Sequence, residues 1–373
     1  MRLDPRSRPV HVPVPLQNSR EPATKGLVRS PSKAFSHKFN CKVKPFWDKG
    51  QSHLFKGAEG TTIHYRTFHH PNERGQLLIL HGFGEDILKY RELSYDFYEM
   101  GFSLVLMDHR DHGLSGRIGK NPEQVHVDCF QNYIHDVEEV ISQSGINRGN
   151  LMVFGHSMGG GITLELLTRH PDLFKGAILS SPMVEINTRF MPKKLLLFLV
   201  NCLVKLGFGE TYCLGQGKPE LNKNITDGDE TNKFRLIHYY KSLEKEEANY
   251  TAKGGPSYQF LREVLAATEG FLDPDFLSKI KIPMILFRTD PDRWVRANEQ
   301  DQLAELKQAR IYVAKGSSHP IFMENSETRN PYMDKIKDFV DKVLPQSTGL
   351  KSFMKFNRNM LTSIFGVGTG PAK

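Results

Sequence analysis

The residues with the clearest chemical potential stand at 155–159, which read Gly-His-Ser-Met-Gly. A serine hydroxyl becomes a nucleophile when a sharp turn exposes it and a nearby base removes its proton. Such a turn needs glycine on both flanks, because a Cβ there would collide with the neighbouring strand and helix. An apolar strand is expected at 151–154 and a helix at 161–169. The sequence therefore predicts that Ser157 lies at a strand–turn–helix elbow, where free backbone N–H groups can face an oxyanion.

The base and the acid that a catalytic serine requires come later in the chain, each after an expected strand. The strand at 284–287 runs into Asp290-Pro-Asp292, and the strand at 310–313 is followed by a loop that carries His319. Nucleophile, acid and histidine in this order are typical of α/β-hydrolases. We expect Ser157 to be the nucleophile, His319 the general base and acid, and Asp292 the carboxylate that orients the histidine. Asp290 is the alternative for that last role.

An oxyanion hole requires two backbone donors. One expected donor is the N–H group of Met158, directly after the nucleophile. The other is expected in the loop after the strand at 76–80, which reads His81-Gly-Phe83-Gly-Glu85. The two glycines of this loop would let the N–H group of Phe83 approach a carbonyl oxygen. We interpret His81 as a structural residue that holds the loop in place.

A second polar cluster, Asp-His-Arg-Asp-His-Gly-Leu-Ser at 108–115, follows the expected strand at 103–107. Its carboxylates and imidazoles could bind a metal ion, or they could form a hydrogen-bonded turn that supports the site. We favour the turn, because a complete serine triad does not need a metal. The four cysteines show no metal-binding spacing. We therefore expect neither a metal nor a cofactor.

Short apolar strands alternate with helices along most of the chain, which is typical of a mostly parallel sheet with helices on both faces. The expected strands are 61–68, 76–80, 103–107, 151–154, 176–180, 284–287 and 310–313, and the expected helices are 88–100, 130–143, 161–169, 298–307 and 332–343. The sequence thus predicts the α/β class. The alternation breaks between 184 and 273, where an insertion would lie above the carboxyl ends of the strands. We interpret this insertion as a helical cap.

We expect the chain to consist of five parts. They are a basic disordered arm at 1–45, a first core part at 46–183, the cap at 184–273, a second core part at 274–344 and a basic amphipathic tail at 345–373. The net charge is +8, and residues 1–50 alone hold 11 Lys and Arg against 3 Asp and Glu. Because basic residues gather at the two ends and are not spread along the chain, we expect no nucleic-acid binding.

Two segments could contact a lipid surface. Residues 191–208 are apolar on nearly all sides and carry lysines at their flanks, so they could be a buried cap helix or a lid helix in the lipid interface. Residues 351–365 place apolar side chains on one helical face with basic residues beside it. No signal-peptide pattern and no apolar run of 18 residues is present in the sequence. We expect a cytoplasmic protein in peripheral contact with the inner membrane face.

These residues resemble the lysophospholipase and monoacylglycerol lipase family of α/β-hydrolases over about 55–343. The resemblance rests on the motifs at 81–85, 108–115 and 155–160, on Asp292-Arg and on Gly-Ser-Ser-His at 316–319; similarity to the bacterial inner-membrane lysophospholipase adds 89–96 and 254–258. The family pattern favours Asp292 over Asp290 as the acid. It implies the α/β-hydrolase fold with a cap over a hydrophobic acyl tunnel. Asp111 departs from the pattern, since such turns often have glycine there.

The resemblance implies a serine hydrolase that cleaves carboxylic esters of single-chain lipids, either lysophospholipids or monoacylglycerols. The reaction would pass through an acyl-enzyme on Ser157, with the triad completed by Asp292 and His319. Two alternatives remain open. One is acyl transfer or thioester hydrolysis on the same triad, and the other is a catalytically silent lipid-binding protein.

Overall fold

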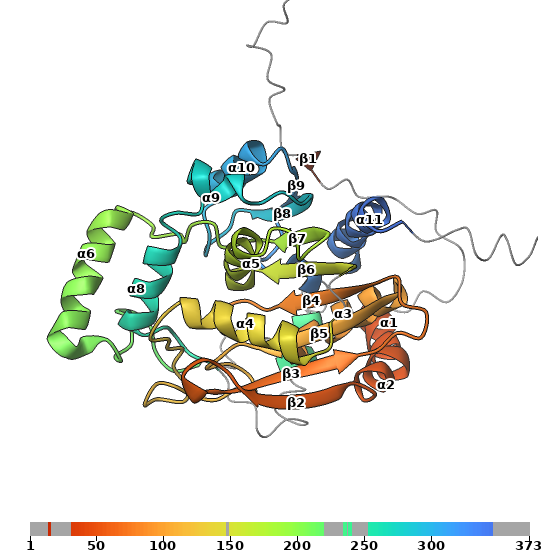
Figure 1. Cartoon of the computed structure of the whole chain (residues 1–373), viewed down its shortest axis with the longest axis horizontal. Helices are drawn as coiled ribbons and strands as arrows, with labels where there is room; N and C mark the ends of the chain where they lie inside the picture. Colours follow the sequence, from red (N-terminus) through yellow and green to blue (C-terminus); the bar gives the residue numbers. More distant parts are fainter. Residues whose placement is uncertain are drawn as a thin grey trace, which may run out of the picture.

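A computed structural model describes residues 14–15, 31–146, 149–219, 234–236, 238–240 and 253–345. Its nine strands form one sheet in the order β1-β9-β8-β7-β6-β4-β5-β3-β2 (Figure 1). The strands are β1 (Val14–Pro15), β2 (Gln51–Lys56), β3 (Thr62–Phe68), β4 (Gly75–Leu80), β5 (Phe102–Asp108), β6 (Leu151–His156), β7 (Gly176–Ser180), β8 (Met284–Asp290) and β9 (Arg310–Lys315). Only the β2–β3 and β3–β5 pairs are antiparallel. The predicted mostly parallel sheet is confirmed.

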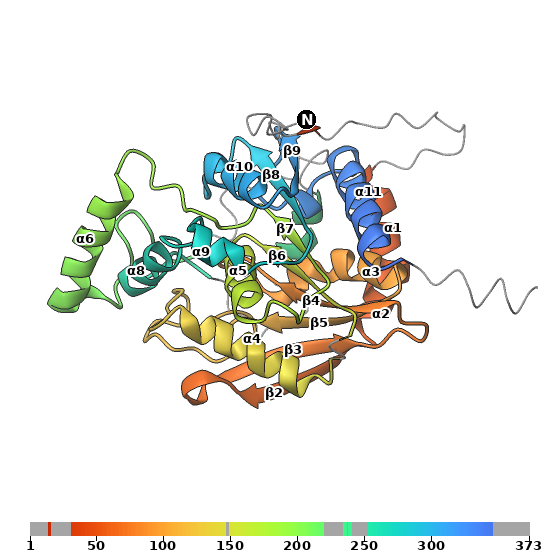
Figure 2. The same ribbon diagram turned by 45° about the horizontal axis from the view of Figure 1, so that its top comes forward.

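Helices cover both faces of this sheet (Figures 1 and 2). The α-helices are α1 (Pro31–Lys38), α2 (Lys44–Trp47), α3 (Arg91–Glu99), α4 (Gln131–Gln143), α5 (Met158–Arg169), α6 (Lys193–Leu203), α8 (Tyr258–Ala267), α9 (Pro274–Ser278), α10 (Ala297–Leu306) and α11 (Ser326–Val343). Shorter helical turns are η1 (Phe39–Val43), η2 (Ala58–Gly60), η3 (Ile87–Tyr90), η4 (Val204–Phe208) and η5 (Ile321–Met323). The expected helices of the core are all present, although α11 begins six residues earlier than predicted.

The apolar residues of the central strands alternate between two cores. In β4, Leu78 and Leu80 belong to one apolar cluster, together with residues of α4, α5 and α10. Their neighbours Leu77 and Ile79 belong to a second cluster, with residues of α3 and α11. Successive side chains of a strand point to opposite faces, so a strand that is covered on both faces must be apolar throughout. This explains why β4 reads as a continuous apolar run.

The arm predicted to be disordered through residue 45 is helical from Pro31 onward, so that part of the prediction is wrong. Phe35 and Phe39 of this segment are buried in a small apolar cluster with Phe234, which lies far away in the sequence. Lys38 also forms ion pairs with Glu92 and with Asp96 of α3. These contacts are tertiary, which is why local periodicity did not reveal them. Most of residues 1–30 and the predicted amphipathic tail after residue 345 lie outside the described residues.

The described part of the insertion contributes α6, η4 and α8. Helix α6 lies beyond α8 and away from the sheet in both views (Figures 1 and 2). Helix α8 carries the inner face, since Phe260 and Val264 belong to the same apolar cluster as α4 and α5. In α6, Val200 is the one buried residue. This arrangement agrees with a cap whose inner helix packs on the core. The exact domain boundaries stay a prediction.

Candidate active site

The loops that carry the predicted site residues all follow the carboxyl ends of neighbouring strands. Ser157 follows β6, the loop 81–85 follows β4, Asp292 follows β8 and His319 follows β9. Since β4, β6, β8 and β9 run parallel to their neighbours in the central sheet, these loops meet at one edge of it. That edge is where open α/β sheets bind ligands.

Ser157 occupies a strained turn between β6 and α5. Its backbone has φ +50° and ψ −116°, a region that residues with a side chain rarely adopt. A Cβ atom on Gly155 would lie 2.4 Å from Oγ1 of Thr163, and one on Gly159 would lie 2.2 Å from the carbonyl oxygen of Leu80. Only glycine fits at either flank. The elbow geometry expected from the sequence is therefore present.

His319 is bonded to Asp292. The Nδ1 atom of His319 lies 2.7 Å from Oδ2 of Asp292, whose side chain is 1% exposed. The same carboxylate accepts hydrogen bonds from the N–H groups of Trp294 and Val295 and from the hydroxyl of Thr289. Burial alone would raise the pKa of Asp292, but the hydrogen bond and charge of His319 and these N–H groups hold its pKa below the usual value. Asp292 is thus kept as an anion facing the imidazole.

Asp290, the alternative acid, does not reach the histidine. Its side chain is 54% exposed, and its carboxylate lies 3.9 Å from the guanidinium of Arg288. Asp290 ends β8, whereas Asp292 lies in the turn that follows. The structure therefore brings Asp292, and not Asp290, into contact with His319.

The second ring nitrogen of His319 is free. Its Nε2 atom is buried and has no hydrogen-bond partner among the described residues, Ser157 included. The ring lies against that of His156, the neighbour of Ser157, with 4.9 Å between the centroids. The hydroxyl of Ser181 donates to the carbonyl oxygen of His319 and fixes the backbone there. Burial lowers the pKa of His156 to about 3, despite the nearby carboxylate of Glu85, so His156 is neutral beside the elbow.

Two backbone donors are open near the serine. Met158 is the first residue of α5, and the first N–H groups of a helix have no partner within it. Neither the N–H group of Met158 nor that of Phe83 has an acceptor within the described part of the chain. A Cβ atom placed on Gly82 would lie 3.1 Å from Cβ of Ser157, so the loop 81–85 touches the elbow.

The motif at 108–115 forms a buried, hydrogen-bonded turn. Asp108 accepts from Nδ1 of His64 at 2.8 Å and from the N–H group of Ile87 at 2.9 Å. Asp111 adopts φ +65°, the left-handed conformation in which glycine is common. Asp adopts this conformation more readily than most residues with a side chain, so it is tolerated where the family often has glycine. No group of residues that could hold a metal ion occurs among the described residues. The motif supports the loops of the site, as the sequence indicated.

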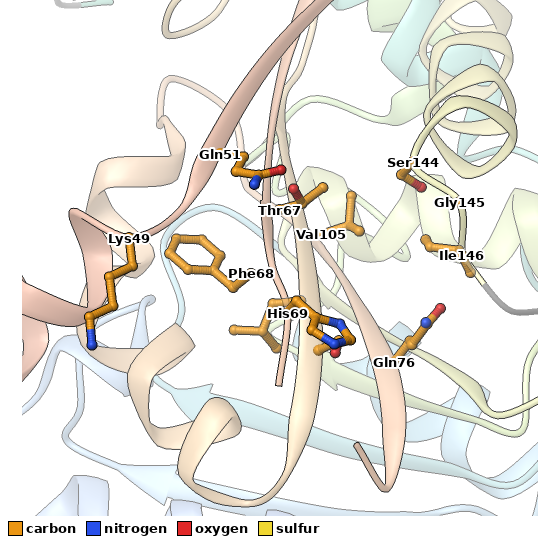
Figure 3. A pocket seen from close by; sticks show the side chains of 12 residues that line it. Lys49, Gln51, Thr67, Phe68, His69, Gln76, Val105, Ser144, Gly145 and Ile146 are labelled. Atoms are coloured by element: carbon orange, nitrogen blue, oxygen red, sulfur yellow. The ribbon is translucent and has the colours of Figure 1, made fainter. Parts of the chain in front are cut away.

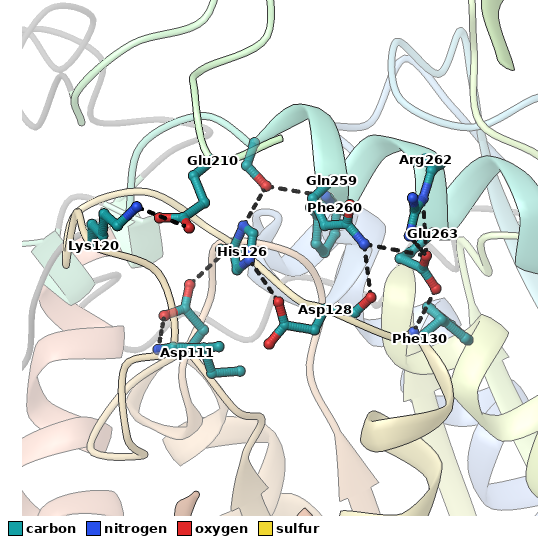
Figure 4. Close-up of polar contacts among 12 residues, drawn as sticks. Asp111, Lys120, His126, Asp128, Phe130, Glu210, Gln259, Phe260, Arg262 and Glu263 are labelled. Carbon is teal, nitrogen blue, oxygen red and sulfur yellow. Dashed lines mark hydrogen bonds and ion pairs between the residues drawn. The ribbon is translucent and has the colours of Figure 1, made fainter. Parts of the chain in front are cut away.

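The cap is joined to the core beside this turn (Figure 4). The N–H group of His126 donates to Asp111, and Nδ1 of His126 lies 2.9 Å from Oγ of Ser257, the residue that caps α8. Phe260 of α8 packs on Phe83, with 5.0 Å between the ring centroids. This contact of the cap with the loop 81–85 could not be expected from the sequence. Both residues are apolar, and nothing local in the sequence signals that they meet.

A hollow of about 300 Å³ lies elsewhere, near the opposite ends of the strands (Figure 3). It is lined by polar side chains that include Lys49, Gln51, Thr67 and His69. Gln76 and Ser103, at the starts of β4 and β5, place it far along the sheet from the loops of the site. No residue of the predicted triad lines it, so it plays no part in the site.

The described residues include no helix that is both long and apolar enough to cross a membrane.

Comparisons with known proteins show the family and the fold of this chain. The family model described as serine aminopeptidase, S33, matches residues 71–326. Lysophospholipase L2 of Escherichia coli (strain K12) is 27% identical over 314 residues, which cover 80% of this chain and 89% of that protein. Monoacylglycerol lipase of Mycolicibacterium smegmatis is 30% identical over 143 residues, or 38% of this chain and 49% of that protein. A soluble variant of monoglyceride lipase from Saccharomyces cerevisiae, solved with a substrate analog, has a TM-score of 0.59 at 21% identity and covers 79% of this chain and 96% of its own.

The family model covers more than half of the chain, and the structural neighbour shows the same fold. The resemblance to lysophospholipases and monoacylglycerol lipases that the motifs indicated is confirmed. The chain belongs to the serine aminopeptidase S33 family of α/β-hydrolases, and it is an ester hydrolase similar to lysophospholipases and monoacylglycerol lipases.

Proposed function

We propose that the protein hydrolyses the carboxylic ester of lipids with one acyl chain through an acyl-enzyme on Ser157. The observation that carries this proposal is the buried Asp292–His319 pair, with 2.7 Å between Oδ2 and Nδ1, next to a serine in a strained elbow. His319 accepts the serine proton on its free Nε2 atom while Oγ attacks the ester carbonyl. Asp292 stabilises the imidazolium that forms.

The tetrahedral intermediate carries its negative charge on the former carbonyl oxygen. The N–H groups of Phe83 and Met158 donate to that oxygen. His319 then gives its proton to the leaving glycerol-side oxygen, and the ester bond breaks to leave the acyl group on Ser157. In the second half His319 takes a proton from water, whose oxygen attacks the acyl carbonyl. The bond to Oγ of Ser157 then breaks and His319 returns the proton to Oγ, which releases the fatty acid and restores the serine. No metal or cofactor takes part in these steps.

The substrate class rests on the relatives and on the cap. The relatives at 27% and 30% identity carry the names lysophospholipase and monoacylglycerol lipase. A cap helix that packs an aromatic ring on the oxyanion loop suits substrates with an acyl chain, since that chain needs an apolar cover beside the serine. Lysophospholipids and monoacylglycerols both fit this description.

The outer face of the cap supports peripheral contact with a membrane. Large apolar side chains are exposed along α6, η4 and the loops beside them: Phe190, Met191, Leu195, Phe198, Leu199, Leu206, Phe208 and Leu214. Monomeric soluble proteins rarely expose a contiguous patch of this kind without an interaction partner. Lys194 and Lys205 lie within it and suit anionic headgroups. A lid on the membrane surface would receive its substrate without passage through water.

The first experiment measures fatty acid release from lysophosphatidylcholine and from monoacylglycerol, for the wild type and for Ser157→Ala. We expect turnover only in the wild type, and the ratio of the two rates identifies the preferred substrate. Equal residual activity in both proteins contradicts the proposal. Added glycerol as a competing acceptor distinguishes hydrolysis from acyl transfer, because a transferase would form new ester instead of free acid. A thioester substrate tests the remaining alternative.

The membrane contact is tested by flotation with vesicles that contain a fraction of anionic lipid. The double variant Leu195→Ser/Phe198→Ser should lose most of its vesicle binding, because the two side chains are 49% and 63% exposed on α6. The matched control is Leu54→Ser, since Leu54 is 66% exposed on β2, far from the cap. Equal binding of all three proteins contradicts the contact through α6.

A further inference from the structure

The loop 81–85 has one open donor between two occupied ones. The N–H group of Gly82 donates to Oε2 of Glu85 at 2.9 Å, and the N–H group of Gly84 donates to Nε2 of His112 at 3.1 Å. The N–H group of Phe83, between them, has no acceptor within the described part of the chain. The two peptide groups that flank the one carrying the Phe83 N–H group are therefore fixed by side chains that come from outside the elbow.

Glu85 is a buried anion that holds the first of these peptide groups. It contacts the ammonium group of Lys89 and accepts the hydroxyl of Tyr90 at 2.5 Å. Burial alone would raise the pKa of Glu85, but the charge of Lys89 and the hydrogen bonds of Lys89 and Tyr90 hold its pKa well below the usual range. The bond from Gly82 is thus made to a charged carboxylate, which makes it stronger than a bond between neutral groups.

His112 holds the second peptide group as a neutral acceptor. Its Nδ1 atom lies 2.9 Å from the carbonyl oxygen of Arg110. A carbonyl oxygen only accepts, so Nδ1 carries the proton and Nε2 keeps the lone pair that receives Gly84. The side chain is fully buried. Burial, together with the charge of Lys253, lowers the pKa of His112 well below its usual value, so the ring stays neutral.

We propose that His112 and Glu85 are positioning residues of the oxyanion hole. They fix the two peptide groups that flank the one carrying the Phe83 N–H group, so that among the N–H groups of Gly82, Phe83 and Gly84 only that of Phe83 faces the substrate oxygen. This rests on the proposed function, which assigns that donor to the oxyanion. Neither side chain touches the substrate. The requirement is tight because a Cβ atom on Gly82 would lie only 3.1 Å from Cβ of Ser157, so a small tilt of the loop moves the donor away from the reacting oxygen.

The motifs at 81–85 and 108–115 thereby acquire a joint role. The motif at 81–85 supplies the donor, the N–H group of Phe83, and one positioning residue, Glu85. The motif at 108–115 supplies the other positioning residue, His112. His81 completes the frame, since its Nδ1 atom lies 2.7 Å from the carbonyl oxygen of Gly82 and its Nε2 atom accepts the N–H group of His109 at 3.0 Å. The expectation that His81 holds its loop agrees with these two bonds.

The test compares His112→Gln with His112→Asn. The glutamine amide reaches the position of Nε2 and can accept from Gly84, whereas the asparagine amide reaches only the position of Nδ1. Loss of a whole oxyanion donor lowers kcat about 10²–10³-fold, so we expect His112→Asn to lose about 10–100-fold through misalignment, while His112→Gln keeps most of kcat. The substrate is p-nitrophenyl butyrate, a soluble ester, and KM should change by less than about twofold because the ground state does not use this donor. Equal kcat for the two variants overturns the proposal.

Tyr133→Phe is the matched control. It removes a buried hydroxyl that has no hydrogen-bond partner among the described residues, so kcat should equal that of the wild type. A second measurement uses the wild type, so it does not depend on whether a variant with a changed core residue folds. The ¹⁵N spectrum of the histidine rings of the wild type should show His112 with its proton on Nδ1 and with Nε2 unprotonated. A proton on Nε2 overturns the proposal.

Ser157→Ala separates this proposal from the proposed function. If Ser157→Ala keeps its activity towards p-nitrophenyl butyrate, the nucleophile is wrong and the oxyanion assignment fails with it. If Ser157→Ala is inactive while His112→Asn matches His112→Gln, the hydrolase stands and only the role of His112 is refuted.

Discussion

The loop 81–85 and the outer cap helix α6 lie on opposite sides of α8 and are built in opposite ways. The loop is held by buried polar bonds from Glu85, His112 and His81, and Phe83 packs on the inner cap helix. Helix α6 buries only Val200 and exposes several large apolar side chains. Rigid dipoles stabilise a developing charge because they need not reorganise during the reaction. A surface that contacts lipid needs exposed apolar area, and it needs few stabilising contacts with the rest of the protein.

The largest expected effect is on kcat, and it concerns the rigidly held polar residues of the site. Asp292→Asn should lower kcat about 10³–10⁴-fold, because the amide stabilises the wrong tautomer of His319 and cannot balance its positive charge. The measurement is kcat on a soluble ester, with circular dichroism to confirm the fold. Asp290→Asn is the control, and it should change kcat by less than about twofold, because its carboxylate is exposed and does not contact His319. Equal losses in both variants would mean that the acid is misassigned.

The second prediction is the effect of acid on the free energy of unfolding, which depends on buried histidines of the core and not on the cap. Burial is the first cause that lowers the pKa of His81, His109, His112 and His156, the last to about 3. In the unfolded chain these groups titrate near pH ~6.5, so below that pH the unfolded state binds protons that the folded state does not. Stability is complete above pH ~6.5 and falls as the pH drops towards the folded pKa values. The slope is about 1.4 kcal/mol per pH unit for each proton, or about 5 for four.

The measurement is the free energy of unfolding by urea at pH 7 and at pH 5. A His109→Asn variant should lose stability at pH 7, but its slope against pH should be smaller by about one proton. A free energy of unfolding that does not change between pH 7 and pH 5 would contradict the burial of neutral imidazoles in the core.

The smallest expected effect is on the cap. Leu195→Ser/Phe198→Ser should change the free energy of unfolding by less than about 0.5 kcal/mol, since exposed substitutions away from special features rarely cost more. Val200→Ala in the same helix should cost about 1.5–3 kcal/mol, because Val200 is buried. The measurement is urea unfolding of the three proteins at pH 7. If the exposed pair costs as much as Val200, α6 is part of the core and the contrast with the loop 81–85 disappears.

Features fixed by local sterics and periodicity could be predicted from the sequence. The elbow follows from Gly155 and Gly159, because any Cβ there collides with Thr163 or with the backbone of Leu80. The strand β7 was predicted at its observed bounds, because a short apolar run with turn signals on both sides has one interpretation. The α/β fold follows from the alternation of such runs with helices.

Features that are fixed by contacts between distant residues could not be predicted from the sequence with the same certainty. Asp290 and Asp292 both follow β8, and only the path of the turn decides which carboxylate meets His319. Helix α1 was missed because its apolar residues pack on Phe234 and its Lys38 pairs with α3. The role that we propose for His112 was missed because it depends on a bond to Gly84, 28 residues away. For helix α1 and for His112, the sequence shows the residue but not the distant residue that it contacts.

The helical segment at 31–47 also determines where the chain can be shortened. Removal of residues 1–30 would leave Phe35, Phe39 and Val43 on their cluster. A chain that begins at residue 71, where the family model begins, would lack β2 and β3 as well. Its β5, which is buried throughout and mostly apolar, would then become an edge strand with unpaired N–H and C=O groups. Such an edge pairs with other copies of the chain, so the shorter protein should aggregate although it retains every residue of the proposed site.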